Sequence, residues 1–178
     1  MKYNVAGIEL QLIQGDIAAQ EDIEAVVNAA NAKLKIGGGV AGAIHRAAGP
    51  ELEEACRELA PIQVGEAVIT SAFELPNQYV IHTLGPIYGQ DKPEAELLAR
   101  CYQNSLHLGE ECQLKSIAFP AISTGAFGYP IKEAAEISLN TIKEIAGELK
   151  KIRLIRFVLY SSRDFNEYKK AAEKILKK

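Results

Sequence analysis

The sequence contains no apolar run long enough to cross a membrane, and its first residues lack the hydrophobic core of a secretion signal. It also lacks an excess of basic residues, since 20 lysines and arginines against 23 acidic residues give a formal net charge of −3. Proteins that bind nucleic acid without regard to sequence present a basic face, which this balance argues against. We therefore expect a cytoplasmic protein with no membrane or nucleic-acid partner. A nucleotide ligand stays open, because backbone amides can hold phosphates without cations.

Cysteine and histidine are too scarce and too scattered to build a disulfide framework or a metal centre. The three cysteines, Cys56, Cys101 and Cys112, are odd in number and show no CxxC spacing. Each falls in a stretch with helical periodicity, where a buried thiol behaves as a small hydrophobic side chain. The three histidines also lie far apart in the sequence. We expect no metal and no organic cofactor.

Segments typical of strands and of helices alternate along the 178 residues. Short apolar runs predict strands at residues 3–8, 9–13, 24–27, 67–71, 79–84, 116–120 and 154–160. Apolar residues at three-to-four spacing predict helices at 40–48, from 50 onward, at 94–111, from 130 onward and at 164–178. Pro50 and Pro130 suit the first positions of two of these helices, because proline is tolerated there.

This alternation predicts an α/β fold of three layers, α/β/α, around a mixed, mostly parallel central sheet. Parallel neighbours need crossover connections, which the helices supply, and the opening pair of strands adds an antiparallel edge. No composition break, repeat or low-complexity linker interrupts the pattern. We expect a single domain over residues 1–178.

Three consecutive glycines, Gly37, Gly38 and Gly39, lie between a predicted strand and a predicted helix. Without Cβ atoms, their backbone amides can come within hydrogen-bonding distance of a ligand. Open α/β sheets bind ligands beyond the carboxyl ends of their strands, where this loop is expected. The loop therefore predicts a pocket for an anionic ligand.

A second loop of the same kind, residues 123–128, reads Ser-Thr-Gly-Ala-Phe-Gly and also precedes a predicted helix. It lacks the Lys-Ser/Thr pair of a Walker loop and the spacing of a dinucleotide GxGxxG motif. Alone, such a loop is a plain connector as often as a binding site. Two of them in one small domain favour a diphosphate ligand.

Two further side chains follow predicted strands and have two interpretations each. Asp16 either caps a helix starting near Gln20 or accepts a hydrogen bond from the exocyclic amine of a base. Tyr160 either packs in the core or stacks on that base. The residues alone leave both pairs of alternatives open.

Three motifs together resemble the macrodomain family, and within it the MacroD-type branch. They are Gly15-Asp16-Ile17, then Val27-Asn28-Ala-Ala-Asn31 continuing to Gly37-Gly-Gly-Val40, and Ile122-Ser-Thr-Gly-Ala-Phe-Gly128. They occur in the family's order, and the resemblance covers nearly the whole chain. It implies a macrodomain that binds ADP-ribose and removes it, as a distal-ribose ester, from acidic side chains of proteins or from acetate.

The resemblance also implies roles for particular residues. Asp16 would bind the adenine amine beside the Ile17 amide, and Tyr160 would flank the adenine. Backbone amides of one loop would wrap the diphosphate, namely those of Ser123, Thr124, Gly125, Ala126 and Phe127. The other loop, Gly37, Gly38, Gly39 and Val40, would press against the distal ribose and one phosphate, and Phe127 would pack on that sugar. Asn31 would bind the ribose hydroxyls and contribute to catalysis, whereas Asn28 would be structural.

Ala41 departs from the MacroD-type pattern, which usually has an aspartate after Gly-Gly-Gly-Val to orient the attacking water. Alanine can neither take a proton nor position water, and the loss of a general base costs roughly 10²-fold or more. His45, four residues on and so on the same helical face, is a candidate acid or base. Its alternative role is to hydrogen-bond the Asn28–Asn31 loop from beneath.

Three functions follow from these observations. The first is hydrolysis of the distal-ribose ester of ADP-ribose, with release of a protein carboxylate or acetate. The second is recognition of ADP-ribose without turnover, which Ala41 favours. The third, a nucleotide or RNA binder, conflicts with the acidic net charge. We expect a monomeric hydrolase whose partners are ADP-ribose, ADP-ribosylated proteins or O-acetyl-ADP-ribose.

Overall fold

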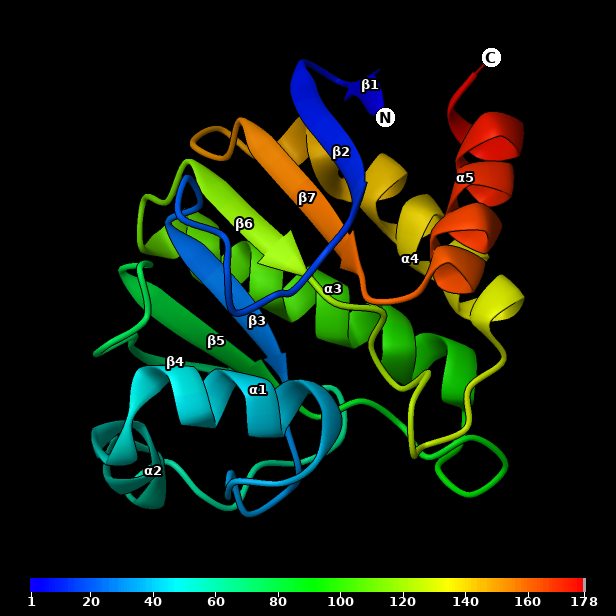
Figure 1. The fold of residues 1–178 in the computed structure, drawn as a ribbon. Helices are drawn as coiled ribbons and strands as arrows, with labels where there is room; N and C mark the ends of the chain where they lie inside the picture. Colours follow the sequence, from blue (N-terminus) through cyan, green and yellow to red (C-terminus); the bar gives the residue numbers. More distant parts are fainter. Residues whose placement is uncertain (178) are drawn as a thin grey trace.

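A computed structural model describes residues 1–177, which build one seven-stranded sheet with helices on both faces (Figure 1). The strand order is β1-β2-β7-β6-β3-β5-β4. The strands are β1 (Lys2–Val5), β2 (Ile8–Gln14), β3 (Ala25–Ala29), β4 (Ala67–Ser71), β5 (Tyr79–Thr83), β6 (Ser116–Phe119) and β7 (Leu154–Leu159). The helices are α1 (Gly39–Ala48), α2 (Pro50–Arg57), α3 (Glu94–Glu111), α4 (Ile131–Ile145) and α5 (Ser162–Leu176), with a 3-10 turn at Ala146–Glu148.

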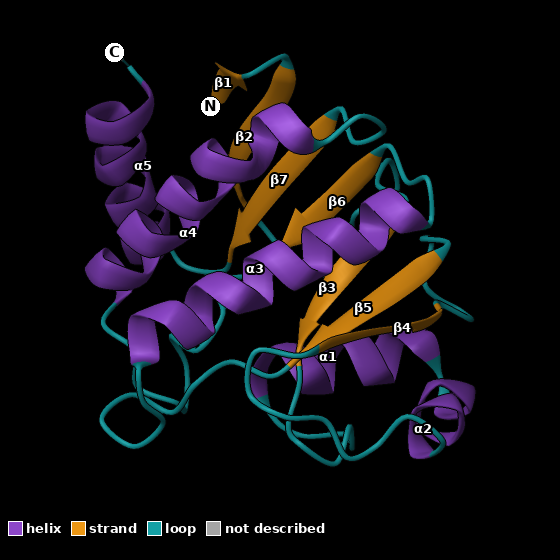
Figure 2. Cartoon of the chain, turned by 180° about the vertical axis from the view of Figure 1, so that it is seen from behind, coloured by secondary structure: helices purple, strands orange, loops and turns teal. Residues whose placement is uncertain are grey.

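The helices divide into two layers, each with its own core against the sheet. Helices α3, α4 and α5 cover one face (Figure 2), where Tyr102, Phe119 and Phe157 are fully buried with ring centroids 5.2–5.9 Å apart. The shorter α1 and α2 cover the other face, where Ile44 and Leu52 are fully buried. The predicted three-layer α/β fold is confirmed.

The sheet is mixed, and its antiparallel pairs lie at both edges. β1 pairs antiparallel with β2, as expected from the opening pair of strands. At the opposite edge β4 also pairs antiparallel with β5, because only seven residues, 72–78, join them and a parallel pair needs a longer crossover. The four strands between them, β2, β7, β6 and β3, are all parallel, and β5 extends this set. Their carboxyl ends therefore meet at one edge of the sheet.

The predicted elements agree with the observed ones to within a few residues, with two corrections. No helix starts near Gln20; residues 15–24 form turns, and Asp16 Oδ1 accepts a hydrogen bond from the Ala18 amide (2.9 Å) instead. Cys112 follows α3 and is exposed, whereas Cys56 and Cys101 are buried as expected. The closing helix starts at Ser162, capped by Ser161 Oγ, and Lys178 lies outside the described residues. Within residues 1–177, none of the helices combines the length and apolarity that a membrane crossing requires.

Candidate ligand-binding cleft

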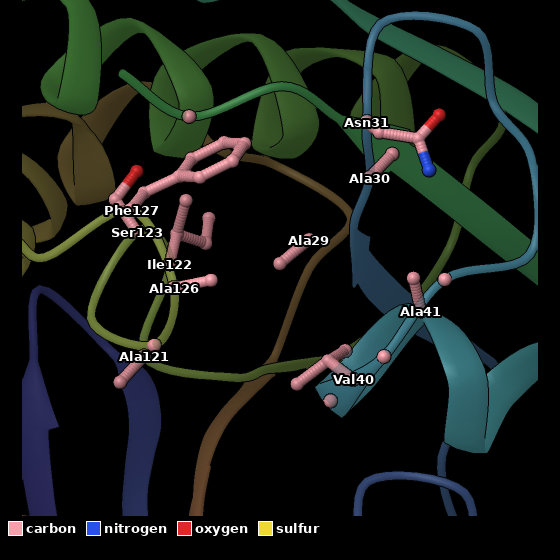
Figure 3. A pocket seen from close by; sticks show the side chains of 15 residues that line it. Ala29, Ala30, Asn31, Val40, Ala41, Ala121, Ile122, Ser123, Ala126 and Phe127 are labelled. Carbon is pink, nitrogen blue, oxygen red and sulfur yellow. The ribbon is translucent and has the colours of Figure 1, made fainter. Parts of the chain in front are cut away.

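Two adjoining cavities lie at the carboxyl ends of the parallel strands. They share part of their lining, Gly39, Val40, Ala121 and Gly125. The first cavity, with a volume of ≈ 310 Å³, lies between the residues after β3 and those after β6 (Figure 3). The second, with ≈ 550 Å³, lies between the residues after β2 and β7. Together they form an elongated cleft along the edge where open α/β sheets bind ligands.

The triple-glycine loop forms one wall of the cleft and leads directly into α1. Gly38 is the N-cap and has no side-chain cap, so the first amides of the helix remain available to an anion. Gly39 has a φ of +54°, a conformation that favours glycine. A Cβ at Gly42 would overlap the Gly37 carbonyl oxygen, so the loop lies directly against the helix. These glycines place backbone without side chains at the carboxyl-end edge of the sheet.

The second loop, after β6, forms the opposite wall and is held by its own backbone. The Tyr129 amide donates to the Ser123 carbonyl (2.9 Å) and the Gly128 amide to the Gly125 carbonyl (3.0 Å). Ser123 has a φ of +66°. Thr124 Oγ1 donates back to the Ala121 carbonyl (2.8 Å), whereas the buried Ser123 hydroxyl has no hydrogen-bond partner among residues 1–177. The Ser123 hydroxyl and the unpaired amides of the loop are therefore the donors left for a ligand.

Asn31 lines the first cavity, but its side chain is already engaged. Nδ2 donates to the Lys35 carbonyl (2.7 Å), and Oδ1 accepts from the Lys35 amide (3.1 Å). In Figure 3 the amide group points away from Phe127 on the facing loop. One N–H and one lone pair remain for a ligand, since a carboxamide offers two donors and two acceptor sites.

Asp16, Ile17 and Tyr160 all line the second cavity. Asp16 Oδ1 is fixed by the Ala18 amide, and no hydrogen bond joins its Oδ2 to another described residue. Tyr160 is 86% exposed, so its alternative assignment to the core is wrong. A carboxylate with a free oxygen beside an exposed ring is an arrangement that can hold an amine-bearing aromatic base.

His45 is the one predicted site residue that lines neither cavity. It is 4% exposed, burial lowers its pKa, and its Nε2 has no hydrogen-bond partner among residues 1–177. It therefore does not hydrogen-bond the Asn28–Asn31 loop through Nε2. Asn28 lies within β3 instead, where its Nδ2 meets Nδ1 of His82 at 3.1 Å.

The cleft also contains residues that the motifs did not indicate. Ala43 and Arg46 of α1, and Asp164 of α5, line the second cavity, and Gly85 lines the first. Helical spacing could have found two of them, because residues 39, 43 and 46 share one face of α1. Gly85 is required by packing, since a Cβ there would overlap the Ser123 hydroxyl.

The fold and cleft define a class: a three-layer α/β domain with two amide-rich loops aimed at an anionic ligand. The chain belongs to the Macro domain family, whose model matches residues 27–138. A "Macro domain-containing protein" of Chlorobaculum tepidum is 50% identical over 163 residues, which cover 91% of this chain and 94% of the relative.

Two further relatives carry more specific names. An "O-acetyl-ADP-ribose deacetylase" of Salmonella newport is 50% identical over 156 residues, covering 85% of this chain and 87% of that protein. A mutant of the Oceanobacillus iheyensis macrodomain, solved with ADPR, has a TM-score of 0.95 at 44% identity and covers 100% of this chain and 99% of its own. The same macrodomain is also solved with ADP, at a TM-score of 0.95.

Proposed function

We propose that the protein, as a single macrodomain over residues 1–178, binds ADP-ribose in the two joined cavities and hydrolyses esters of its distal ribose. One observation carries the proposal: thirteen of the fourteen predicted site residues line this one cleft, although they come from four separate loops. Relatives named for O-acetyl-ADP-ribose deacetylation, or solved with ADPR, support the same ligand.

The adenosine half of the ligand suits the second cavity. Asp16 Oδ2 would accept from the exocyclic amine, with Ile17 beside it and Tyr160 against the ring. The diphosphate would cross the shared part of the cleft, between Val40 on α1 and the loop of Ser123, Thr124, Gly125, Ala126 and Phe127. Backbone amides and the N-terminus of α1 would balance its charge, which explains how an acidic protein can hold it.

The distal ribose and its ester suit the first cavity, between Asn31, Gly37–Gly39 and Phe127. Water would add to the ester carbonyl, and the carbonyl–ribose oxygen bond would then break to give a carboxylic acid and the free ribose hydroxyl. Asn31 and Ser123 are the polar side chains of this cavity, so no ionisable group of its lining can act as a base. Asn31, the ribose and the ligand's own phosphate would position the water. Positioning alone can lower the activation barrier by several kcal/mol, which would account for the acceleration of the reaction.

His45 has a different role in this proposal from the one its position in the sequence suggested. Its imidazole is buried outside both cavities, and burial lowers its pKa, so we propose that it supports α1 rather than exchanging protons with the ester.

Recognition without turnover is the second candidate function. Ala41 lines the first cavity where a general base is usual in similar hydrolases, and the Asn31 amide is bonded to Lys35. A protein of this kind would retain ADP-ribosylated proteins without cleaving them.

The test is acetate release from O-acetyl-ADP-ribose, followed together with ADP-ribose binding by calorimetry. Turnover with binding supports the hydrolase, and binding without turnover supports the recognition module. A protein that neither binds ADP-ribose nor releases acetate contradicts both.

A further inference from the structure

A buried arginine underlies the loop that carries Asp16. Arg156, in the middle of β7, is 8% exposed, and its guanidinium donates in three directions. Nη1 and Nη2 each donate to Asp22 (2.7 Å), Nε donates to Gln11 Oε1 (2.7 Å), and Nη1 also donates to Gln20 Oε1 (2.9 Å). A guanidinium satisfied in this way fixes its neighbours, because each bond to a charged donor has a preferred geometry.

Gln20 joins this arginine to the cleft. Its side chain is buried, and its Nε2 donates to the Asp16 backbone carbonyl (2.8 Å). Arg156, Gln20 and Asp16 thus form a continuous chain of hydrogen bonds from the sheet to the second cavity. The only other residue bonded to the Asp16 carbonyl within residues 1–177 is Ala19, through its amide (3.1 Å).

Asp16 depends on such bonds because no regular element holds it. Between β2 and β3 the backbone forms only turns, so neither helix nor sheet geometry sets the direction of its carboxylate. A hydrogen bond from a ligand weakens steeply when its angle or length departs from the optimum. The orientation of Asp16 therefore controls how well its free oxygen meets a donor in the cavity.

We propose that Gln20, held in place by Arg156, is a positioning residue that gives the second cavity its selectivity for a base with an exocyclic amine. The inference rests on the proposed function, in which Asp16 accepts from the adenine amine. A base with an oxo group in place of the amine offers no donor there. Its oxygen would face Asp16 Oδ2, and the two would repel each other. Discrimination between the two bases requires a carboxylate held in one direction. The Ala18 amide fixes its Oδ1, and the bond from Gln20 fixes the backbone that carries it.

The decisive variant is Gln20→Glu. Glutamate keeps the volume and the acceptor for Arg156 but has no donor for the Asp16 carbonyl. The matched control is Asp22→Asn, which weakens the other arm of the same arginine and leaves the bond from Gln20 to Asp16 in place. Gln20→Met, which lacks both donor and acceptor, is the second variant should Gln20→Glu fail to fold. Thermal denaturation shows which variants are folded.

The measurement is the ratio of calorimetric affinities for ADP-ribose and for its hypoxanthine analogue, in which an oxo group replaces the amine. We expect the ratio to fall by about threefold to tenfold in Gln20→Glu, the worth of one hydrogen bond, and to stay unchanged in Asp22→Asn. An unchanged ratio in Gln20→Glu, or an equal fall in Asp22→Asn, overturns the proposal. Wild type that binds neither ligand contradicts the proposed function instead, so the two failures are distinguishable.

Discussion

The side-chain amide of Asn31 and the backbone of Lys35 are joined by two hydrogen bonds, at 2.7 and 3.1 Å. They close a small ring in the chain after β3, at the edge of the first cavity. The same side chain thus shapes the loop before the triple glycine and presents its remaining donor and acceptor to the cavity. A substitution at Asn31 therefore changes both the shape of this loop and the polar groups of the cavity.

Asn31→Ala is expected to abolish turnover while weakening ADP-ribose binding only a few-fold, because most binding contacts lie elsewhere in the cleft. Acetate release and calorimetry on the same preparation measure the two effects. A fully active Asn31→Ala protein would show that the catalytic assignment is wrong.

Gly125→Glu is expected to reduce ADP-ribose affinity by roughly a hundredfold or more, since like charges in contact cost several kcal/mol. A Cβ at Gly125 meets nothing within 4 Å, so the fold should tolerate the change. Gly147→Glu is the matched control, because its Cβ is equally free and it lies in the turn after α4, outside both cavities. Retained affinity in Gly125→Glu would refute the assignment of this loop to the diphosphate.

Ala41→Asp is expected to leave turnover unchanged or to raise it by up to about 10²-fold, because the new carboxylate can orient water in the first cavity. Ala41→Asn controls for size without adding a base. The rate of acetate release at saturating substrate measures the effect. A large loss in the aspartate variant, with binding intact, would mean that the water approaches from another direction.

The buried His82 predicts a pH dependence of stability. Burial, reinforced by the nearby His45, lowers the pKa of His82 from 6.5 to about 3. Above pH 6.5 the His82 imidazole is neutral in both the folded and the unfolded protein. Below pH 6.5 the imidazole is protonated in the unfolded chain but stays neutral in the folded protein. The free energy of unfolding should therefore fall as the pH drops from 6.5 toward 3, by at most about 1.4 kcal/mol per pH unit for this residue.

Urea unfolding between pH 6.5 and 5, where carboxylates still carry their charge, measures this slope. His82→Gln should have a shallower slope than the wild type, whatever its absolute stability, and His45→Gln controls for the second buried imidazole. Equal slopes in His82→Gln and the wild type would contradict the assignment.

Local signals were enough to predict most of the fold. Apolar runs, helical spacing and the prolines at 50 and 130 predicted every strand and α-helix in the described chain. The antiparallel pairing of β4 was not predicted, because strand direction depends on how a connection folds back. The helix predicted near Gln20 was wrong; Gln20 instead bonds Arg156, a long-range contact that local helix propensity does not contain.

The cleft was predictable wherever its residues belong to a continuous motif. His45 was misplaced by reasoning from helical spacing alone: it shares a face with Ala41 but lies one turn further from the helix N-terminus, where the cavity is. The hydrogen bonds behind Asp16 could not be predicted, because Arg156 lies 134 to 145 residues along the chain from its partners Gln11, Gln20 and Asp22. Only the sheet, which places β2 beside β7, brings them together.

Ester hydrolysis is tested most directly by the release of ADP-ribose from a glutamate-linked mono-ADP-ribosylated protein, run beside Asn31→Ala. We expect release by the wild type and none by the variant, which would establish an ester hydrolase that works with Ala41 in its site. Retention of the modified protein without release would contradict hydrolysis and leave a domain that recognises ADP-ribose.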